Sequence, residues 1–367
     1  MAGIAAAAFY LPRHVITAEA YRKGAGRFDA EGVTEKSVAG FDEDEVTMAV
    51  AAADRLLTGK DVAAIDVLAF ATSNPVAGGT IVAEALGLPP AKARDVWGTS
   101  DAGETALAGA IDAAGREGTT TLVVAADVPR SDVESPDEDP LGAAAVALLV
   151  TPEGRASWGR GTRPSQSVIR HRVGDVGSAS VLLSFLTTIE PSQVAGDPDV
   201  ARSLNERTPV TYEQYLAMRR HAPPPGTEYS QGAYVSLSAY RSEAKARYRL
   251  IAERCTACGR VHFPPRESCL ACGAQTWEDV ALPRTGRVYS YTIIGKGAAP
   301  SEFLDQQLAL GDYATGVVEI DEGPRVAAML TDADPKAVTI GMPVRMVFRR
   351  IYTQEGVTRY GFKFAPA

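Results

Sequence analysis

The four cysteines are the residues whose spacing most directly specifies a chemistry. Cys255 and Cys258 form one C-x-x-C-G unit, and Cys269 and Cys272 form a second one after ten intervening residues. Two matched units are typical of a zinc ribbon, in which four thiolates close a tetrahedron and leave no open position for a substrate. The glycine after each pair lets the backbone turn around the ion. The pattern predicts a structural zinc site, with iron in a rubredoxin-like site as the alternative.

Two other interpretations of these cysteines are weaker. A redox C-x-x-C needs only one pair, and a disulfide framework spreads its cysteines along the chain rather than in one short segment. His262 lies between the two pairs, but with four sulfurs available we expect it to be a packing or surface histidine rather than a ligand.

A basic segment leads into the first cysteine pair. Residues 238–253 read as a helix, and its cations face only Glu243 and Glu253, which leaves a net charge of about +3 on a short surface. This surface either attracts a nucleotide phosphate or is a solvated helix face, and both interpretations stay open. The cations concerned are Arg241, Lys245, Arg247, Arg249 and Arg254.

The whole chain has the composition of a globular protein. It has 367 residues, of which 46% are hydrophobic and 22% charged, and this length predicts two or three domains. The net charge of −8 gives no general attraction for nucleic acid or anionic lipid. No apolar run reaches the roughly 20 residues of a membrane span, and the start lacks the order of a signal peptide. We therefore expect a cytoplasmic protein without a membrane segment.

Apolar and amphipathic runs alternate over the first 150 residues. Such alternation is typical of a layered α/β sheet with helices on its faces. The acidic stretch 127–139 reads as a solvated loop rather than a metal site. A glycine loop then leads into an apolar helix over 181–189. The expected strands are 65–72, 92–98, 120–127 and 141–150, and the expected helices are 45–57 and 102–114.

The rest of the chain predicts a connector and a small barrel. Residues 191–237 are rich in proline and glycine around one helical fragment, 212–220, and we expect them to wrap or dock. About five short strands follow the cysteines and suggest an OB-fold. The expected strands are 287–294, 314–320, 324–330, 343–351 and 359–364.

The last 120 residues carry a family resemblance. From about Tyr248 the sequence reads RLIAERCTACGRVHFPPRESCLACG, then GRVYSYTII, VVEIDEGPRVAAML, IGMPVRMVF and YGFKFAPA. It resembles the zinc-ribbon and OB-fold family that accompanies acyl-CoA thiolases and synthases. This resemblance implies an accessory module that docks beside a thiolase-fold enzyme and helps to hold or channel the acyl-CoA. On this interpretation Arg241, Lys245, Arg247 and Arg249 would contact the phosphates of coenzyme A.

The first 190 residues resemble a different family. The segments EKSV at 35–38, FDED at 41–44, TMA at 47–49 and TIVAEALG at 80–87 are similar to the amino-terminal half of 3-hydroxy-3-methylglutaryl-CoA (HMG-CoA) synthase, a thiolase-fold enzyme. GDVGSAS at 174–180 resembles the glycine loop near the end of that enzyme. A complete thiolase fold needs two halves, but only a few dozen residues separate these matches. Most of the second half is therefore expected to be missing.

The same resemblance bears on catalysis. The family uses a cysteine nucleophile at the start of a buried helix, and WGTSDAGETAL at 97–107 places Asp101 there. Aspartate cannot form the acyl thioester, and Asp175 stands where the family has an asparagine. The family's histidine would lie in the missing part. Ser100 lacks an identifiable base, and Asp101 is either a general base or, as we prefer, the N-cap of the helix that follows.

These observations favour an accessory, non-catalytic subunit of an acyl-CoA thiolase- or synthase-type complex, with a thiolase-fold partner in a hetero-oligomer. A self-sufficient acyl-CoA aldolase or acyltransferase that uses Asp101 is the alternative. A nucleic-acid-binding OB protein is remote, because residues 281–367 hold ten basic against nine acidic side chains. The expected domains are a truncated thiolase-like α/β domain (1–190), a connector (191–237), a helix with a rubredoxin-like zinc ribbon (238–280) and an all-β OB-fold barrel (281–367).

Overall fold

The computed structural model divides the chain into two compact units, Met1–His221 and Ala222–Ala367. The boundary falls inside the expected connector, and the domain limits given above remain predictions. The structure describes residues 2–132, 135–158, 167–189, 194–195, 200–219, 243–354 and 357–367.

Unit 1 is built around one mixed five-stranded sheet with the order β1-β7-β6-β4-β5. Strands β6, β4 and β5 are parallel, whereas β7 runs antiparallel to both β6 and β1. The elements are β1 (Gly3–Tyr10), β2 (His14–Thr17), α1 (Ala18–Ala25), β3 (Glu35–Val38), α2 (Glu45–Leu57), η1 (Val62–Ala64), β4 (Val67–Thr72), α3 (Gly79–Leu86), η2 (Pro90–Lys92), β5 (Ala93–Trp97), α4 (Ala102–Glu117), β6 (Thr121–Asp127), η3 (Pro136–Glu138), β7 (Ala144–Thr151), α5 (Ser167–Val173), η4 (Gly177–Ala179), α6 (Ser180–Leu186), α7 (Val200–Asn205), β8 (Thr208–Pro209) and α8 (Tyr212–Arg219).

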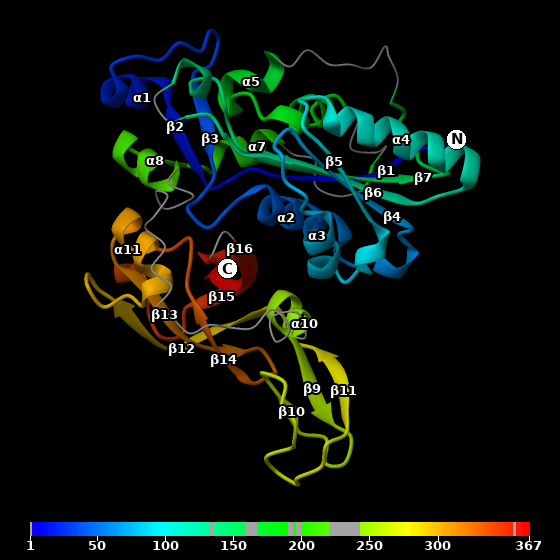
Figure 1. Ribbon diagram of the computed structural model, residues 1–367, viewed down its shortest axis with the longest axis vertical. Coiled ribbons are helices and arrows are strands. Elements are labelled where there is room, and N and C mark those ends of the chain that lie inside the picture. Colours follow the sequence, from blue (N-terminus) through cyan, green and yellow to red (C-terminus); the bar gives the residue numbers. More distant parts are fainter. Residues whose placement is uncertain are drawn as a thin grey trace. The chain divides into compact units, whose positions relative to one another are not determined.

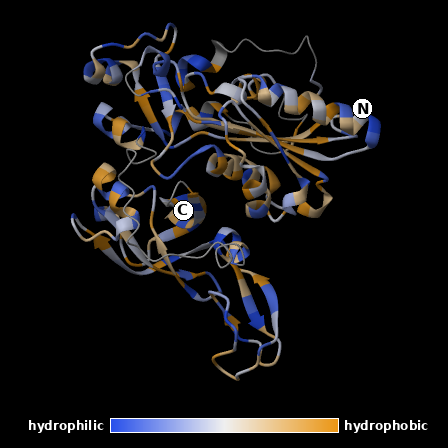
Figure 2. Cartoon of the chain, viewed as in Figure 1, coloured by the Kyte–Doolittle hydropathy of each residue, from blue (hydrophilic) through white to orange (hydrophobic). Residues whose placement is uncertain are grey.

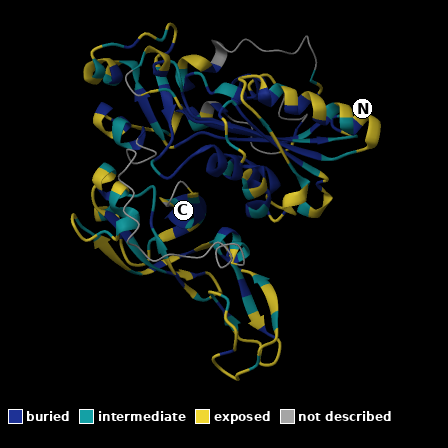
Figure 3. Cartoon of the chain, in the orientation of Figure 1, coloured by how far each residue is buried: buried dark blue, intermediate teal, exposed yellow. Residues whose placement is uncertain are grey.

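Helices cover both faces of this sheet, which confirms the predicted layered α/β architecture. Helix α4 lies on one face, and α2 and α3 lie on the other (Figure 1). Every residue of β6 is buried, and the central strands are the most hydrophobic and best-buried part of the unit (Figures 2 and 3). Helix α6 packs in the same apolar cluster as α4. The described residues of unit 1 contain one such five-stranded sheet.

Part of the segment expected to be a connector folds into unit 1. Strand β8 pairs with β2 in a small sheet of order β3-β2-β8, and α8 packs near α1. Tyr215 donates to the Glu138 carboxylate, and Arg219 contacts the same carboxylate at 2.8 Å and 2.9 Å. Because these contacts are buried, residues 200–219 are part of the domain.

The expectation that the stretch 127–139 is a solvated loop is wrong for its key carboxylates. Asp127, Glu138 and Asp139 are buried. Two of them face cations: the Lys36 ammonium lies 3.8 Å from Glu138, and Arg27 donates to Asp139 at 2.9 Å. Burial of a carboxylate requires such partners, and sequence alone does not reveal them.

Unit 2 contains a three-stranded ribbon sheet, β10-β9-β11, and a five-stranded sheet, β14-β13-β12-β15-β16. A bridge between Leu330 and Phe364 joins the two ends of the second sheet and nearly closes the predicted OB-type barrel. The elements are α10 (Ala244–Arg249), β9 (Ile251–Cys255), β10 (Val261–His262), β11 (Trp277–Ala281), β12 (Thr285–Ile294), η5 (Ser301–Phe303), α11 (Leu304–Leu310), β13 (Tyr313–Ile320), β14 (Arg325–Met329), η6 (Pro335–Ala337), β15 (Pro343–Gln354) and β16 (Val357–Pro366).

The helix expected over 238–253 is too long at its carboxyl end. Helix α10 ends at Arg249, because Leu250 adopts a left-handed conformation with φ of 56°. Residues Ile251–Cys255 are instead the central strand of the ribbon sheet, paired on both sides. The part before residue 243 lies outside the described residues. In the described part of the chain, no helix is long and apolar enough to span a membrane.

Candidate functional site

The four cysteines converge on one point, as the sequence predicts. Their sulfur atoms lie within 4.8 Å of one another. The sulfurs of Cys255 and Cys272 are 3.7 Å apart, and those of Cys258 and Cys269 are 3.6 Å apart. Four sulfurs around a tetrahedral zinc at about 2.3 Å would be separated by about 3.8 Å. The donor set therefore fits one structural zinc ion with a closed shell of four sulfurs.

Each cysteine pair is held by the same tight turn. The Gly259 N–H donates to the Cys255 carbonyl at 2.8 Å, and the Gly273 N–H donates to the Cys269 carbonyl at 2.8 Å. The two glycines have φ values of 77° and 76°, a left-handed conformation that disfavours side chains. The C-x-x-C-G spacing thus encodes two matching knuckles.

His262 supports the cysteine cluster from outside. It is buried, its Nε2 lies 3.3 Å from the sulfur of Cys269, and its ring packs edge-on against Trp277. These contacts confirm that His262 is a packing histidine. Its Nε2 also forms a hydrogen bond with a ligand sulfur, an arrangement that orients metal ligands. Backbone N–H donors, chiefly that of Ala271, lower the pKa of the Cys269 thiol to about 6 and favour its metal-binding thiolate form.

Asp101 occupies the N-cap position of α4, but the capping role that we preferred for its side chain is not borne out. Its side chain is exposed and makes no hydrogen bond that caps the helix. The general-base alternative requires an apolar pocket around the carboxylate, and Asp101 lacks one. Ser100 is exposed as well.

The glycine loop lies directly against the start of α4. A Cβ on Gly103 would lie 2.2 Å from the Ser178 carbonyl oxygen and 3.1 Å from the Ala125 side chain. Only a glycine allows this contact. The fold therefore brings the helix start that bears Asp101 and the loop that bears Asp175 together.

Asp175 stabilises the conformation of its own loop. Its Oδ1 accepts the Gly177 N–H and the Ser180 hydroxyl, each at 3.0 Å. Its backbone accepts from the Gly142 N–H at 2.8 Å. These contacts give Asp175 a structural role in the loop.

A buried carboxylate that the sequence analysis did not single out joins this loop to the sheet. Oδ1 of Asp127 accepts from the Thr72 hydroxyl at 2.7 Å and from the Ser73 N–H and hydroxyl, each at 2.8 Å. Its Oδ2 accepts from the Ser178 N–H at 2.6 Å and from the Ser178 hydroxyl at 2.5 Å. Burial raises the pKa of Asp127, and these hydrogen bonds oppose the rise.

The sequence did hold a signal for this cluster. Thr72 and Asp127 are the last residues of two predicted strands, and the carboxyl ends of adjacent parallel strands meet at one edge of a sheet. That β4 and β6 are adjacent, and that Ser178 approaches them, depends on the tertiary structure.

Glu45 forms a second buried cluster at the same edge. It accepts from Asn74 at 2.6 Å and from the Arg130 guanidinium at 3.0 Å and 2.8 Å. Asn74 also donates to the Val128 carbonyl at 2.9 Å. Burial raises the pKa of Glu45, and Arg130 opposes the rise. These polar groups satisfy one another, which suits them to fix loops at this edge.

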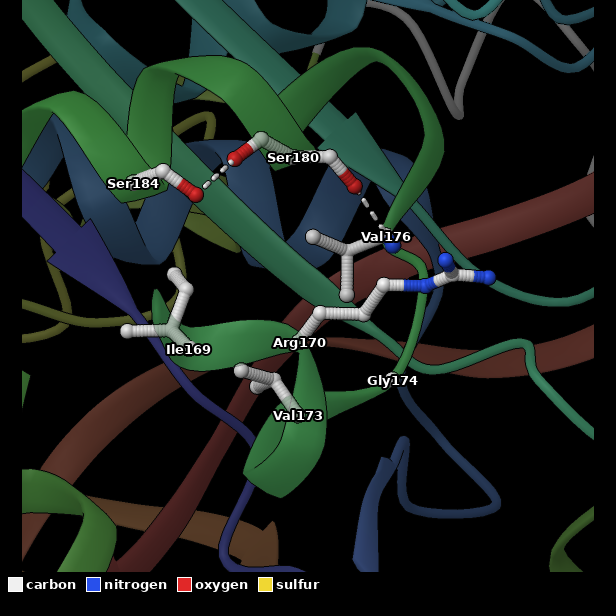
Figure 4. Close-up of a pocket in the computed structure, with 7 residues that line it drawn as sticks. All are labelled: Ile169, Arg170, Val173, Gly174, Val176, Ser180 and Ser184. Carbon is white, nitrogen blue, oxygen red and sulfur yellow. Dashed lines mark hydrogen bonds between the residues drawn. The ribbon is translucent and has the colours of Figure 1, made fainter. Parts of the chain in front are cut away.

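A small pocket lies beside the glycine loop (Figure 4). The Ser180 hydroxyl accepts from the Val176 N–H at 2.9 Å, and the Ser184 hydroxyl donates to the Ser180 carbonyl at 2.9 Å. The pocket has room for about one water molecule, too little for an acyl chain. Its lining residues are Ile169, Arg170, Val173, Gly174, Val176, Ser180 and Ser184.

The basic residues before the ribbon differ in their surroundings. The Lys245 ammonium lies 2.5 Å from Asp279 and 4.0 Å from Glu253, so its charge is balanced within unit 2. Arg247 packs its side-chain stem over Gly361. Arg249 is half-buried at the end of α10. Arg241 lies outside the described residues.

Comparison with known proteins matches both parts of unit 2. Residues 242–278 match a family model described as the ChsH2 rubredoxin-like zinc ribbon domain, and residues 279–349 match the ChsH2 C-terminal OB-fold domain. The benzoylsuccinyl-CoA thiolase subunit BbsA of Thauera aromatica is 30% identical over 80 residues, which are 22% of this chain and 50% of that protein.

Unit 1 resembles solved structures in its fold. A crystal structure of HMG-CoA synthase complexed with CoA aligns with a TM-score of 0.52 and 16% identity, over 64% of this chain and 94% of that one. At this identity the likeness shows the fold alone, and it confirms the predicted thiolase-type architecture.

A closer relative covers unit 2. A DUF35 domain-containing scaffold protein of Methanocaldococcus jannaschii is 41% identical over 125 residues, which are 33% of this chain and 84% of that protein. A second such protein, from Methanothermobacter thermautotrophicus, is 37% identical over 123 residues, 33% of this chain and 88% of its own length. Through its zinc ribbon and OB-fold, this chain therefore belongs to the family of DUF35 domain-containing proteins.

Proposed function

We propose that this chain is an accessory subunit of an acyl-CoA thiolase- or synthase-type complex that makes or breaks carbon–carbon bonds. This chain docks a thiolase-fold enzyme, which carries the nucleophile. This chain also helps to bind or channel the acyl-CoA. The observation that carries this proposal is the fusion itself: a DUF35 zinc ribbon and OB-fold follow a thiolase-type half in which Asp101 occupies the start of α4.

Two further observations support the accessory role. Relatives that consist almost wholly of the matched part are named scaffold proteins, and another relative is named a thiolase subunit. A thiolase-fold partner would supply the catalytic cysteine, and zinc would hold the ribbon through Cys255, Cys258, Cys269 and Cys272.

The direct test is co-expression with a thiolase-fold protein encoded in the same genome. We expect a hetero-oligomer that stays intact through size-exclusion chromatography, with a mass that contains both subunits. A chain that purifies as a fully active homo-oligomer would overturn the proposal and favour the Asp101 enzyme instead.

Binding of coenzyme A is a separate part of the proposal. Arg247 and Arg249, with Arg241, would contact the phosphates, whereas Lys245 is engaged by Asp279. An Arg247→Glu, Arg249→Glu double variant should weaken acyl-CoA binding by the assembled complex at least about tenfold. Arg325→Glu, at a half-exposed residue of β14 outside this basic surface, is the matched control. Unchanged affinity in a double variant of normal thermal stability would show that this surface is only a solvated helix face.

A further inference from the structure

The four cysteines of the ribbon differ in how far solvent reaches them. Cys255 and Cys269, the first cysteine of each knuckle, are 0% and 3% exposed. Cys258 and Cys272, the second cysteine of each knuckle, are exposed. A thiolate is oxidised more readily the more accessible it is. A dissolved oxidant therefore meets Cys258 and Cys272 first, and these two residues come from different knuckles.

The contacts of the buried pair add to this difference. The Cys269 sulfur lies 3.3 Å from Nε2 of His262 and accepts from the Ala271 N–H at 3.4 Å. Donors directed at a sulfur engage its lone pairs, which makes it a weaker nucleophile toward an oxidant. Cys255 is the last residue of β9 and pairs with Trp277 of β11. The buried pair is thus fixed in place by its surroundings.

The exposed pair is close enough to form a bond. The sulfurs of Cys258 and Cys272 lie 4.8 Å or less apart and would have to approach to the disulfide length of about 2.05 Å. A Cβ on Gly259 or Gly273, the glycines that follow these cysteines, would meet nothing within 4 Å. Leu270, in the second knuckle, is 69% exposed. Little packing therefore opposes a movement of either knuckle.

The tip of the ribbon, residues 256–274, depends on the metal for its stability. Within it, His262 and Cys269 are the only buried residues. Phe263 packs toward the barrel instead, with its ring centroid 5.9 Å from that of Phe362. A segment with so small an apolar core needs a metal to hold its fold. Loss of the metal should loosen the tip and leave the barrel, which has its own apolar core, intact.

We propose that Cys258 and Cys272 form an oxidation site for hydroperoxides, at which a disulfide between the two residues displaces the metal from the ribbon. The oxidised tip then loses its fixed structure, so the ribbon responds to the redox state of its surroundings. The inference goes beyond the proposed accessory function and does not depend on it.

The reaction consumes one hydroperoxide and two protons. One thiolate sulfur attacks a peroxide oxygen, the O–O bond breaks, and the alkoxide or hydroxide that leaves takes up a proton. The product at this sulfur is a sulfenic acid. The second thiolate attacks the sulfenic sulfur, the S–S bond forms, and the hydroxide that leaves takes up the second proton as water. Two electrons pass from the two sulfurs to the peroxide, and two of the four metal ligands are lost.

The test uses the full chain, reduced and loaded with zinc, with hydrogen peroxide as the oxidant. A chromogenic zinc indicator should report release of about one zinc per chain. Peptide mass mapping should find the disulfide between Cys258 and Cys272. Amide exchange over residues 256–274 should become at least about tenfold faster, while exchange over Tyr313–Ile320 of the barrel should not change. Dithiothreitol with added zinc should reverse these effects.

Two matched variants test which cysteines react. Histidine supplies a nitrogen ligand to zinc but cannot form a disulfide. Cys258→His should therefore release zinc at least about tenfold more slowly than the unmodified chain at the same peroxide concentration. Cys255→His keeps both exposed cysteines, and its release rate should change less than about twofold.

Mapping of the unmodified chain decides the question even if a variant does not bind zinc. A disulfide that includes Cys255 or Cys269, a sulfinic acid as the main product, or full retention of zinc after peroxide treatment would each overturn the proposal.

Discussion

At the scale of single residues, the side chain at the start of α4 decides what unit 1 can contribute. A cysteine at a helix start is activated because the helix dipole favours its thiolate. A carboxylate there is stable and cannot carry an acyl group as a thioester. Because Asp101 is exposed and does not cap α4 through its side chain, we assign it no catalytic role.

Asp101→Ala should therefore have a small effect. The free energy of unfolding should change by less than about 1 kcal/mol, the scale of a charge near a helix start, and the activity of the assembled complex should not change. Thr17→Ala is the comparison, because the Thr17 hydroxyl does cap α1 by accepting from the Ala20 N–H, and its loss should cost about 1 kcal/mol. Loss of activity in a folded Asp101→Ala complex would restore the catalytic alternative.

The zinc cluster gives a second prediction at this scale. Elemental analysis should find about one zinc per chain, and Cys258→Ser should release the metal and speed amide exchange over residues 254–274, because metal binding supplies folding energy to such ribbons. Leu270→Ser, at a residue of the second knuckle that is 69% exposed, should keep its zinc. A reduced, freshly purified sample without metal would contradict the assignment.

The buried Asp127 carboxylate at the end of β6 gives a third prediction at this scale. Asp127→Asn replaces an acceptor oxygen with an amide group that faces donors from Thr72, Ser73 or Ser178, so unfolding should become easier by at least about 2 kcal/mol. Asp112→Asn, on the exposed side of α4, should cost less than about 0.5 kcal/mol. Equal effects of the two variants in chemical denaturation would refute the role given to Asp127.

At the scale of elements, the sequence predicts best where local signals agree with packing. Helix α2 has the bounds that its apolar spacing predicts, and Asp44 with Thr47 forms a capping box at its start. Strand β1, by contrast, contains four consecutive alanines, which favour helix. It is a strand because it pairs with β7 along its length.

The candidate site, like the elements, could be predicted only where local sequence signals determine its geometry. The cysteine spacing sufficed for the metal cluster, since its geometry is local. The helix predicted through residue 253 failed because strand pairing on both sides of β9 outweighed helical propensity. The Asp127 cluster required knowledge of which strands are neighbours, and that information is tertiary.

The buried contacts around Glu138, which join α8 to the rest of unit 1, lead to a prediction about pH. Burial lowers the pKa of the Lys36 ammonium to about 8, although its charge faces Glu138 and the rings of Tyr21 and Tyr215. Between pH 8 and the ordinary lysine value of 10.5 the unfolded chain therefore binds more protons than the folded one. The part of the unfolding free energy that depends on Lys36 should therefore rise with pH between pH 8 and 10.5.

Lys36→Met isolates this effect. The unfolding free energy of the unmodified chain should rise relative to Lys36→Met between pH 7 and pH 10, by up to about 3 kcal/mol. Lys23→Met, at an exposed residue of α1, should show no such trend. Parallel stability curves for the unmodified chain and Lys36→Met would contradict the lowered pKa.

At the scale of the whole molecule, two units of different fold are joined in one chain. Unit 2 has the fold of proteins named scaffolds, and unit 1 has one sheet of a thiolase-type fold within the described residues. The proposal that this chain acts through a partner rests on this combination and on the absence of a cysteine at the start of α4.

The most direct test of this account is a titration of enzyme activity. A thiolase-fold protein encoded in the same genome is held at fixed concentration, and acyl-CoA carbon–carbon bond turnover is measured as this chain is added. Turnover should be weak or absent for either protein alone and should rise to a plateau at a fixed stoichiometric ratio. Full turnover by this chain alone, or turnover by the partner that is unaffected by it, would contradict the account.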